Sequence, residues 1–391
     1  MKSVEGGEVD EALATKIAQE IENIDKTLKV EEIQDLVEKK LMASKYKDAA
    51  KNYMNYRYLR TMARSQYKEL MDSIAEKLSA KNVQNQNANV DEASFGGRMG
   101  EANDVVTRRY ALEYIVSPKT KANHENNEIY IHDLNAYAVG SHNCLSVPFD
   151  HLLEKGFNTR QTDVRPAQSI NTAFQLVAVI FQLQSLQQFG GVSATHLDWT
   201  MVPYVRKSFK KHFEDGVKYI EREDYWMDDN IIATEYPIDD IIYKKHEKAY
   251  NYAMDMTKRE CYQAVEGMYH NLNTLQSRSG NQLPFTSINY GTCTLPEGRL
   301  VIKALLDTSI KGIGKLHKTS IFPCGIFQYM KGVNDKPGTP NYDLYRLALK
   351  STSLRLYPNY ANVDWSGNAG YDINDPKTYF STMGKCKLQL M

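Results

Sequence analysis

Apolar residues in the first part of the chain recur every three or four positions, which is the spacing of helices that bury one face. Three such helices are indicated within residues 8–78, and their apolar positions are Leu13, Ile17 and Ile21, then Val30, Ile33, Val37 and Leu41, then Ala49, Tyr53, Tyr56 and Met62. Short amphipathic helices are marginal alone, so we expect these to pack together as a helical domain over residues 1–78. The polar, Asn-rich stretch at 79–92 predicts a linker.

The pattern at 168–191 is different, because apolar residues cover nearly the whole circumference of the predicted helix. Glutamines supply its only polarity, so we expect this helix to be buried on two sides, either beneath a sheet or against a second subunit. Gly190 and Gly191 are its expected C-terminal cap. A second helix is predicted to begin near Pro203, and a long third helix covers about 246–276.

From residue 285 onward, strand and helix patterns alternate with short connections. Strands are predicted at 285–292, 320–329 and 360–365, with helices at 297–313 and 342–356. A further short strand is predicted at 129–131, where two isoleucines flank a tyrosine. Such alternation implies parallel strands joined by right-handed crossovers, so residues 93–391 are predicted to form an α/β fold.

The composition is that of an ordinary globular protein. Hydrophobic residues make up 42% and charged residues 25% of the chain, and the formal net charge is zero. A neutral chain has no global field that favours nucleic acid or an anionic membrane. There is no stretch of about 18 apolar residues and no signal-peptide pattern, so we expect a cytoplasmic protein without a membrane or nucleic-acid partner.

The five cysteines do not have metal-binding spacing. None of Cys144, Cys261, Cys293, Cys324 and Cys386 forms a C-x-x-C pair, so we predict no metal site in this chain. Cys261 and Cys324 fall inside predicted elements and are expected to pack in the core. Cys293 directly follows a predicted strand, where it either packs or lines a site.

The stretch at 127–145 holds the main candidate chemistry. His132 and Asp133 follow the predicted strand at 129–131, and the C-terminal ends of strands are where α/β sheets and barrels place functional residues. Gly140 allows the chain to turn, so we expect Cys144 to fold back beside His132. The alternative is a capped strand followed by a buried, inert cysteine.

Two other motifs have structural alternatives. The glycine-rich segment 94–104 fits neither G-x-G-x-x-G nor the P-loop, and we expect a tight turn there before a helix at 103–116. The basic run after Pro203 is either a solvated helix face or an anion-binding surface. It consists of Arg206, Lys207, Lys210 and Lys211.

Several short motifs, weak singly, occur together in one order. They are Ser-Phe-Gly-Gly-Arg at 94–98, Ile-His-Asp-Leu at 131–134, Asn-Cys at 143–144, Gln-Ser-Ile-Asn-Thr at 168–172, Gln-Phe-Gly-Gly-Val-Ser at 188–193, Pro-Tyr-Val-Arg-Lys-Ser-Phe at 203–209, Ser-Ile-Asn-Tyr-Gly-Thr at 287–292 and Pro-Glu-Gly-Arg at 296–299. As a set they closely resemble the anaerobic, class III ribonucleoside-triphosphate reductases, over about residues 10–385.

The resemblance implies the first half of a ten-stranded α/β barrel, with a finger loop through its centre, preceded by a helical partial ATP-cone at 1–78. It implies a thiyl radical on the finger-loop cysteine, for which Cys386 is an approximate match. Cys144 matches the second cysteine of that family. His132, Asp133, Asn143 and Cys144 are the implied substrate-binding residues. Ribonucleoside triphosphates are the implied substrates, and formate the reductant.

The resemblance also implies partners and regulation. It implies a homodimer with an effector site for deoxynucleotides beside the helix at 168–191, for which Gln168, Gln182 and Lys211 are candidates. A glycyl radical, a zinc site and a radical S-adenosylmethionine activating enzyme belong to the family, with the first two in a C-terminal region not represented here. ATP is an implied effector of the cone.

The sequence departs from the family near its end. The finger loop reads Met383-Gly384-Lys385-Cys386-Lys387, one residue longer than the family pattern. We therefore expect a domain truncated near the finger loop and inactive alone. One alternative is a non-catalytic nucleotide-binding or dimerisation module that works with a separate C-terminal half. Another, a pyruvate formate-lyase relative, requires two adjacent cysteines that this loop does not offer.

Overall fold

The computed structural model describes residues 11–79, 94–137, 139–140, 142–188, 190–222, 236–278, 282–365 and 370–383. Contacts divide the chain into two compact units, Met1–Asn82 and Val83–Met391. The predicted linker at 79–92 lies, apart from Ser79, outside the described residues.

Within residues 11–79, the first unit has the three helices predicted: α1 (Glu11–Glu22), α2 (Val30–Ala43) and α3 (Lys47–Ser79). Its core is small and is formed by Ile17, Leu41 and Ala50. Arg57 of α3 joins α2 electrostatically, because its guanidinium pairs with Glu31, Asp35 and Glu38.

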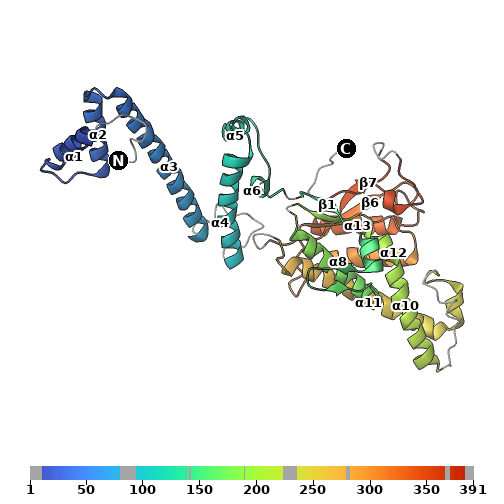
Figure 1. The fold of residues 1–391 in the computed structure, drawn as a ribbon. Helices are drawn as coiled ribbons and strands as arrows, with labels where there is room; N and C mark the ends of the chain where they lie inside the picture. The colour runs from blue at the N-terminus through green and yellow to red at the C-terminus, as the bar shows by residue number, and fades with distance from the viewer. Residues whose placement is uncertain are drawn as a thin grey trace. The chain divides into compact units, whose positions relative to one another are not determined.

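The second unit is built on a five-stranded parallel sheet. The strands are β1 (Leu145–Ser146), β4 (Val192–Ala194), β5 (Thr286–Tyr290), β6 (Cys324–Tyr329) and β7 (Asn359–Asn362). They lie in the sheet in chain order. Because right-handed crossovers that all advance in one direction return on the same side, this order places the connecting helices on one face of the sheet. Figure 1 shows α8, α11 and α12 beneath it.

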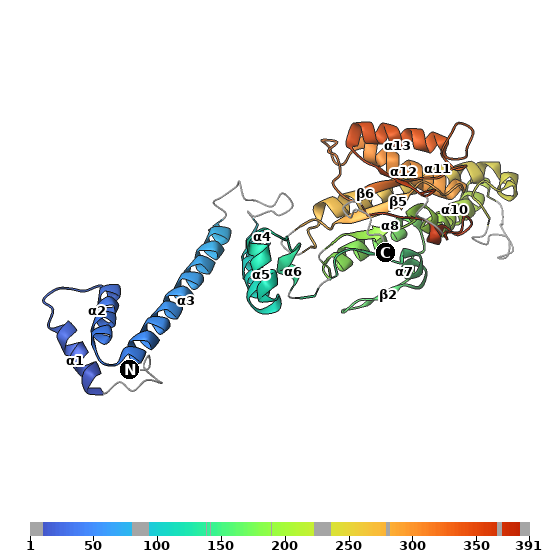
Figure 2. The same cartoon turned by 90° about the horizontal axis from the view of Figure 1, so that it is seen from above.

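The helical layer forms one continuous core with that face of the sheet. It contains α8 (Ile170–Ser185), α10 (Val202–Gly216), α11 (Glu247–Thr274), α12 (Pro296–Lys311) and α13 (Tyr342–Arg355). Helix α8 packs against α11 and β4, and therefore lies beneath the sheet, which is one of the two predicted placements. Figure 2 shows α12 and α13 side by side, in agreement with their contacts. The predicted α/β fold is confirmed.

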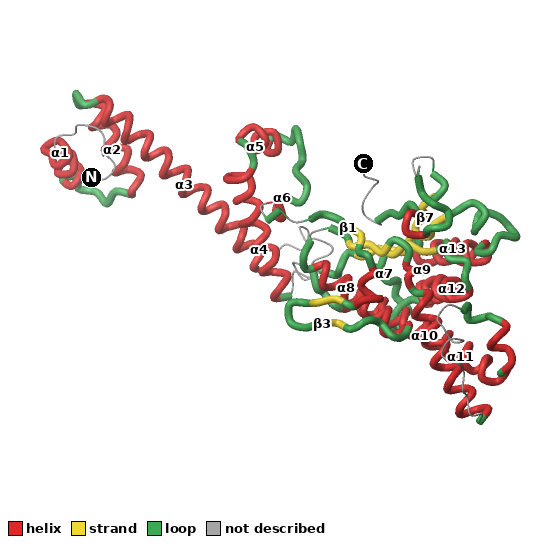
Figure 3. Tube along the Cα trace, turned by 45° about the vertical axis from the view of Figure 1, so that its right-hand side comes forward, coloured by secondary structure: helices red, strands yellow, loops and turns green. Residues whose placement is uncertain are grey.

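Shorter elements complete the described part of this unit. They are α4 (Phe95–Tyr110), the π-helix η3 (Ala111–Ile115), α5 (Pro118–Glu125), α6 (Leu134–Tyr137), α7 (Phe149–Lys155), the hairpin of β2 (Phe157–Asn158) and β3 (Asp163–Val164), α9 (Leu197–Thr200), η4 (Val217–Glu221), η5 (Ile241–Lys245) and η6 (Pro376–Thr378). Figure 3 shows α7, α9 and β3 beside the sheet and its helices. No helix among the described residues is long and apolar enough to cross a membrane.

Three predicted elements are wrong. Residues 129–131 form no strand, and Ile129 and Tyr130 are exposed, so the sheet begins only at Leu145. The glycine-rich segment is not a turn before a helix at 103–116 but the first part of α4, capped by the Ser94 hydroxyl, which accepts the Gly97 N–H. Helix α8 ends at Ser185, so the glycines after it are not its cap.

Candidate active site

Cys144 directly precedes the first strand of the sheet. Leu145 of β1 is in register with Val192 of β4, which brings Cys144 beside Gly191. The Gly191 backbone N–H donates to the Cys144 sulfur at 3.2 Å. The thiol also lies 3.6 Å from the side-chain oxygen of Asn143. Cys144 therefore lies at the N-terminal end of β1. The expectation that His132 and Asp133 lie at the C-terminal end of a strand is wrong, because residues 129–131 form no strand.

The glycine pair at 190–191 allows two chain segments to meet at this point. A Cβ atom on Gly190 would lie 1.8 Å from the carbonyl oxygen of Asn143, well inside any possible contact. Only glycine therefore fits where the chain passes Asn143. The Gln-Phe-Gly-Gly motif thus places a backbone N–H on the Cys144 sulfur instead of capping a helix.

His132 and Asp133 form a local pair. The His132 Nδ1 atom lies 2.7 Å from an oxygen of Asp133, and the imidazole side chain is 76% exposed. Its ring is edge-on to Tyr130. Asp133 has a φ of 55°, a left-handed conformation that Asp tolerates better than most residues. His132 is therefore oriented by its neighbours in sequence.

Arg278 lies near this pair and near Cys144, and sequence reasoning missed it. It is 5% exposed, and its guanidinium lies 3.8 Å from the centre of the Phe285 ring. Burial lowers the pKa of Arg278 to about 10, and the proximity of Asp133, Asp104 and Cys144 opposes that shift. An arginine in the loop between α11 and β5 carries no local sequence signal.

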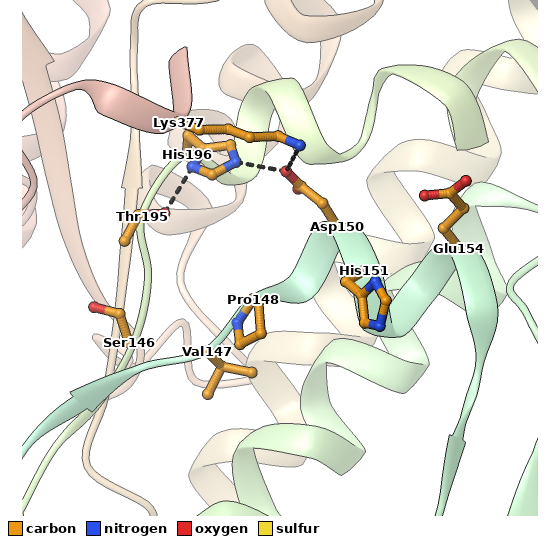
Figure 4. Close-up of a pocket in the computed structure, with 9 residues that line it drawn as sticks. All are labelled: Ser146, Val147, Pro148, Asp150, His151, Glu154, Thr195, His196 and Lys377. Atoms are coloured by element: carbon orange, nitrogen blue, oxygen red, sulfur yellow. Dashed lines mark hydrogen bonds and ion pairs between the residues drawn. The ribbon is translucent and has the colours of Figure 1, made fainter. Parts of the chain in front are cut away.

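A second polar cluster lies at the C-terminal ends of β1 and β4 (Figure 4). His196 Nε2 is 2.8 Å from Asp150, its Nδ1 is 2.6 Å from the Thr195 hydroxyl, and Thr200 also binds Asp150. Lys377 reaches Asp150 at 3.5 Å. Burial raises the pKa of Asp150, but the hydrogen bonds and charge of His196, with Thr200, outweigh it and hold that pKa at about 2. The cluster borders a cavity of about 380 Å³.

The candidate effector residues are dispersed. Gln168 donates to the Pro166 carbonyl at 3.3 Å, and Gln182 of α8 donates to Asn271 of α11. Lys211 is exposed on α10. Cys386 lies outside the described residues. Among the described residues, no group of three His, Cys, Asp or Glu side chains is arranged to hold a metal.

The remaining described cysteines are in the core. Cys261 and Cys293 are 0% exposed and Cys324 is 4% exposed. Cys293 packs so closely on α12 that a Cβ atom on Gly298 would lie 2.2 Å from its sulfur. Burial raises the pKa of both Cys261 and Cys293, which keeps these thiols protonated. Among the described thiols only Cys144 is partly exposed.

Two buried carboxylates hold several motif segments together inside the fold. Asp198 is fully buried, and one of its oxygens accepts the backbone N–H groups of Gly291, Thr292 and Cys293 at 2.9, 3.1 and 2.9 Å. Glu297, also 0% exposed, accepts from Arg206 at 2.8 Å. The Pro-Glu-Gly-Arg and Pro-Tyr-Val-Arg motifs are therefore joined by a buried ion pair.

Two family models match the chain. One, described as anaerobic ribonucleoside-triphosphate reductase, matches residues 86–391, and one described as ATP cone domain matches residues 1–62. The anaerobic ribonucleoside-triphosphate reductase of Haemophilus influenzae is 32% identical over 363 residues, which cover 91% of this chain and 48% of that protein. The enzyme of the same name from Enterobacteria phage T4 is 32% identical and covers 71% of this chain and 42% of its own length.

Solved structures share the fold. The crystal structure of the anaerobic ribonucleotide reductase from Thermotoga maritima in complex with dATP and CTP has a TM-score of 0.50 and 15% identity, and the match covers 79% of this chain and 49% of that one. At this identity the likeness shows the fold alone, which is the α/β fold of a ribonucleotide reductase. The family model that matches most of the chain shows more: the chain belongs to the anaerobic ribonucleoside-triphosphate reductase family. It spans about half the length of the curated relatives it matches.

Proposed function

We propose that this chain carries part of the ribose-binding site of an anaerobic ribonucleoside-triphosphate reductase. The observation that carries the proposal is the setting of Cys144, the partly exposed thiol beside the Gly191 N–H, in a chain of this family. In this proposal Cys144 faces the ribose of a ribonucleoside triphosphate. Asn143, Asp133 and His132 bind the substrate around it.

The chemistry proposed for these residues is hydrogen and proton transfer. Reduction replaces the 2′-hydroxyl by hydrogen, the hydroxyl leaves as water, and formate is oxidised to carbon dioxide. A thiol S–H bond is weak enough to exchange hydrogen with a ribose carbon, which is the proposed task of Cys144. The His132–Asp133 pair is suited to move a proton toward the departing hydroxyl, as general acids do. The glycyl radical of the family supplies the initial one-electron oxidation, through the finger-loop cysteine that Cys386 is proposed to represent.

The barrel and its partners belong to the same proposal. The five parallel strands in chain order form half of the proposed ten-stranded barrel. The proposed homodimer uses the C-terminal end of α8, where Leu183 and the following Leu186 are exposed. An activating enzyme is the proposed source of the radical. No residue described here is assigned to the glycyl radical or to zinc.

Protection of cysteines from alkylation tests the proposed substrate site. The chain is treated with iodoacetamide, with and without saturating ribonucleoside triphosphate, and each modified cysteine is quantified by mass spectrometry. We expect the nucleotide to slow alkylation of Cys144, while the buried Cys261, Cys293 and Cys324 serve as internal controls. An unchanged Cys144 rate, with nucleotide binding demonstrated by calorimetry, would contradict the assignment and favour the non-catalytic nucleotide-binding alternative.

Effector binding is proposed for Gln168, Gln182 and Lys211. An effector triphosphate needs cations, and Lys211 is an exposed one on α10. Lys211→Ala is expected to weaken deoxynucleotide binding about tenfold, because a charge-assisted hydrogen bond is lost. Lys311→Ala, on α12, is the matched control. Equal affinities of the two variants, measured by calorimetry, would remove Lys211 from the effector site.

A further inference from the structure

The face of the sheet that points away from the helices is largely polar. Side chains alternate along a strand, so Ile288, Tyr290 and Phe327 enter the helix-side core, while their neighbours point to the other face. On that other face lie Ser193, Ser287, Asn289 and Gln328, and each is at most 5% exposed. Some part of the chain must therefore cover this polar surface.

The segment at 379–383 covers it through backbone hydrogen bonds. The Asn289 side-chain amide donates to the Thr382 carbonyl at 3.0 Å, and its oxygen accepts the Thr382 N–H at 3.2 Å. The Gln328 amide donates to the Phe380 carbonyl at 2.9 Å. The same Asn289 nitrogen also donates to the Ala194 carbonyl at 3.0 Å, which holds the amide in place.

We infer that Asn289 and Gln328 are positioning residues, which clamp residues 380–382 across the sheet and so hold Met383 beside Gly191. An amide offers a donor and an acceptor like those of a peptide group, so Asn289 pairs with Thr382 as a neighbouring strand would. Every bond goes to the backbone of the clamped segment. The clamp therefore fixes the backbone of this segment and does not depend on the clamped side chains.

The clamped segment matters because the residue that follows it lies beside the candidate site. Met383, the next residue after Thr382, lines a small cavity together with Gly191, Ser287 and Cys324. Gly191 is the residue whose N–H holds the Cys144 sulfur. A shift by one residue would exchange the backbone groups that the two amides meet. The inference rests on the proposed function, in which the following segment brings Cys386 to Cys144.

Two variants and a control test the clamp in the full chain. Asn289→Asp keeps the acceptor but loses the donor to Thr382. Gln328→Met has a similar volume and removes only donated bonds, because the Gln328 oxygen has no partner among the described residues. Thr382→Val is the control, since the Thr382 backbone makes the bonds. Hydrogen exchange is measured by mass spectrometry for peptides that contain 379–383 and 286–290.

We expect the amides of 379–383 to exchange about tenfold faster in both variants, at unchanged exchange in β5, and Thr382→Val to match the wild type. Unchanged exchange at 379–383 in a folded variant would overturn the clamp. If Asn289→Asp does not fold, the exchange of residues 379–383 in Gln328→Met alone tests the clamp.

A cross-linking readout separates positioning from mere packing. Mild oxidation with diamide is followed by mass spectrometry of the Cys144–Cys386 disulfide. We expect both variants to lower the yield severalfold against wild type and Thr382→Val. An unchanged yield despite faster exchange would overturn the positioning role. A wild type that forms no such disulfide, with the clamp intact by exchange, would contradict the proposed function and leave the clamp standing.

Discussion

Two groups of polar residues in the second unit differ in how far they are buried. The first group, Asp198 and Glu297, is fully buried and binds backbone and ion-pair partners inside the fold. The second group, around Cys144 and His132, is partly exposed. Buried polar groups that are bonded inside the fold stabilise one structure, whereas exposed ones remain accessible to a ligand. Glu297, His132 and Cys144 all lie in family motifs, so the motif alone does not separate them.

Breaking the buried ion pair is expected to have the largest effect. Glu297→Ala leaves the Arg206 guanidinium, 14% exposed, without its carboxylate, so we expect a loss of about 3–5 kcal/mol in the free energy of unfolding. Lys303→Ala breaks an exposed pair on the same helix and is expected to cost less than about 0.5 kcal/mol. Chemical denaturation of both variants makes the comparison. Similar losses in the free energy of unfolding would mean that the buried ion pair stabilises the fold no more than the exposed pair does.

Filling the space at Gly190 sharpens the comparison at the candidate site. Gly190→Ala is expected to cost about 1–3 kcal/mol, because its Cβ meets the Asn143 carbonyl and must displace it. The displacement should also change the alkylation rate of Cys144. Gly267→Ala in α11 is the matched control: nothing lies within 4 Å of its added Cβ, and we expect it to stabilise the protein by roughly 0.5–1 kcal/mol. A tolerated Gly190→Ala would contradict the close approach.

The Asp150–His196 cluster is intermediate in burial between the two groups, and its contribution to stability depends on pH. The pKa of Asp150 is lowered from 3.8 to about 2 in the folded state, so its stabilisation is present above about pH 4 and is lost as the pH falls toward 2. Asp150→Asn should remove roughly 2 kcal/mol at neutral pH and flatten the stability profile between pH 4 and 2. Thermal melts across this range measure it. A parallel displacement of the whole profile would argue against Asp150 as the titrating group.

Replacement of His132 is expected to have the smallest effect on stability. Its side chain is 76% exposed, so His132→Ala should change the free energy of unfolding by less than about 0.5 kcal/mol. By the proposed function, the same variant should weaken the protection of Cys144 by ribonucleoside triphosphate. Tyr114→Ala, which is similarly exposed on η3, is the control. Full protection in His132→Ala would remove His132 from the substrate site.

Hydrophobic periodicity was enough to predict the helical first unit, the α/β class of the second and the elements from residue 246 onward, because it reports which face each element buries. The sequence also identified Cys144 as the thiol of interest. The strand predicted at 129–131 is wrong, because β-branched and aromatic residues favour a strand only where they can pack in a sheet. Here Tyr130 is exposed. The three-residue strand β4 was too short to show a period.

The contacts between polar residues that are distant in sequence could be identified only in the folded structure. Arg278 approaches Asp133 and Cys144, Gly190 meets Asn143, and Asn289 meets Thr382 across long stretches of sequence. Periodicity records the burial of one residue at a time, whereas a hydrogen bond or a close approach is a property of two distant residues in one fixed geometry. That geometry arises only when the strands are paired in register.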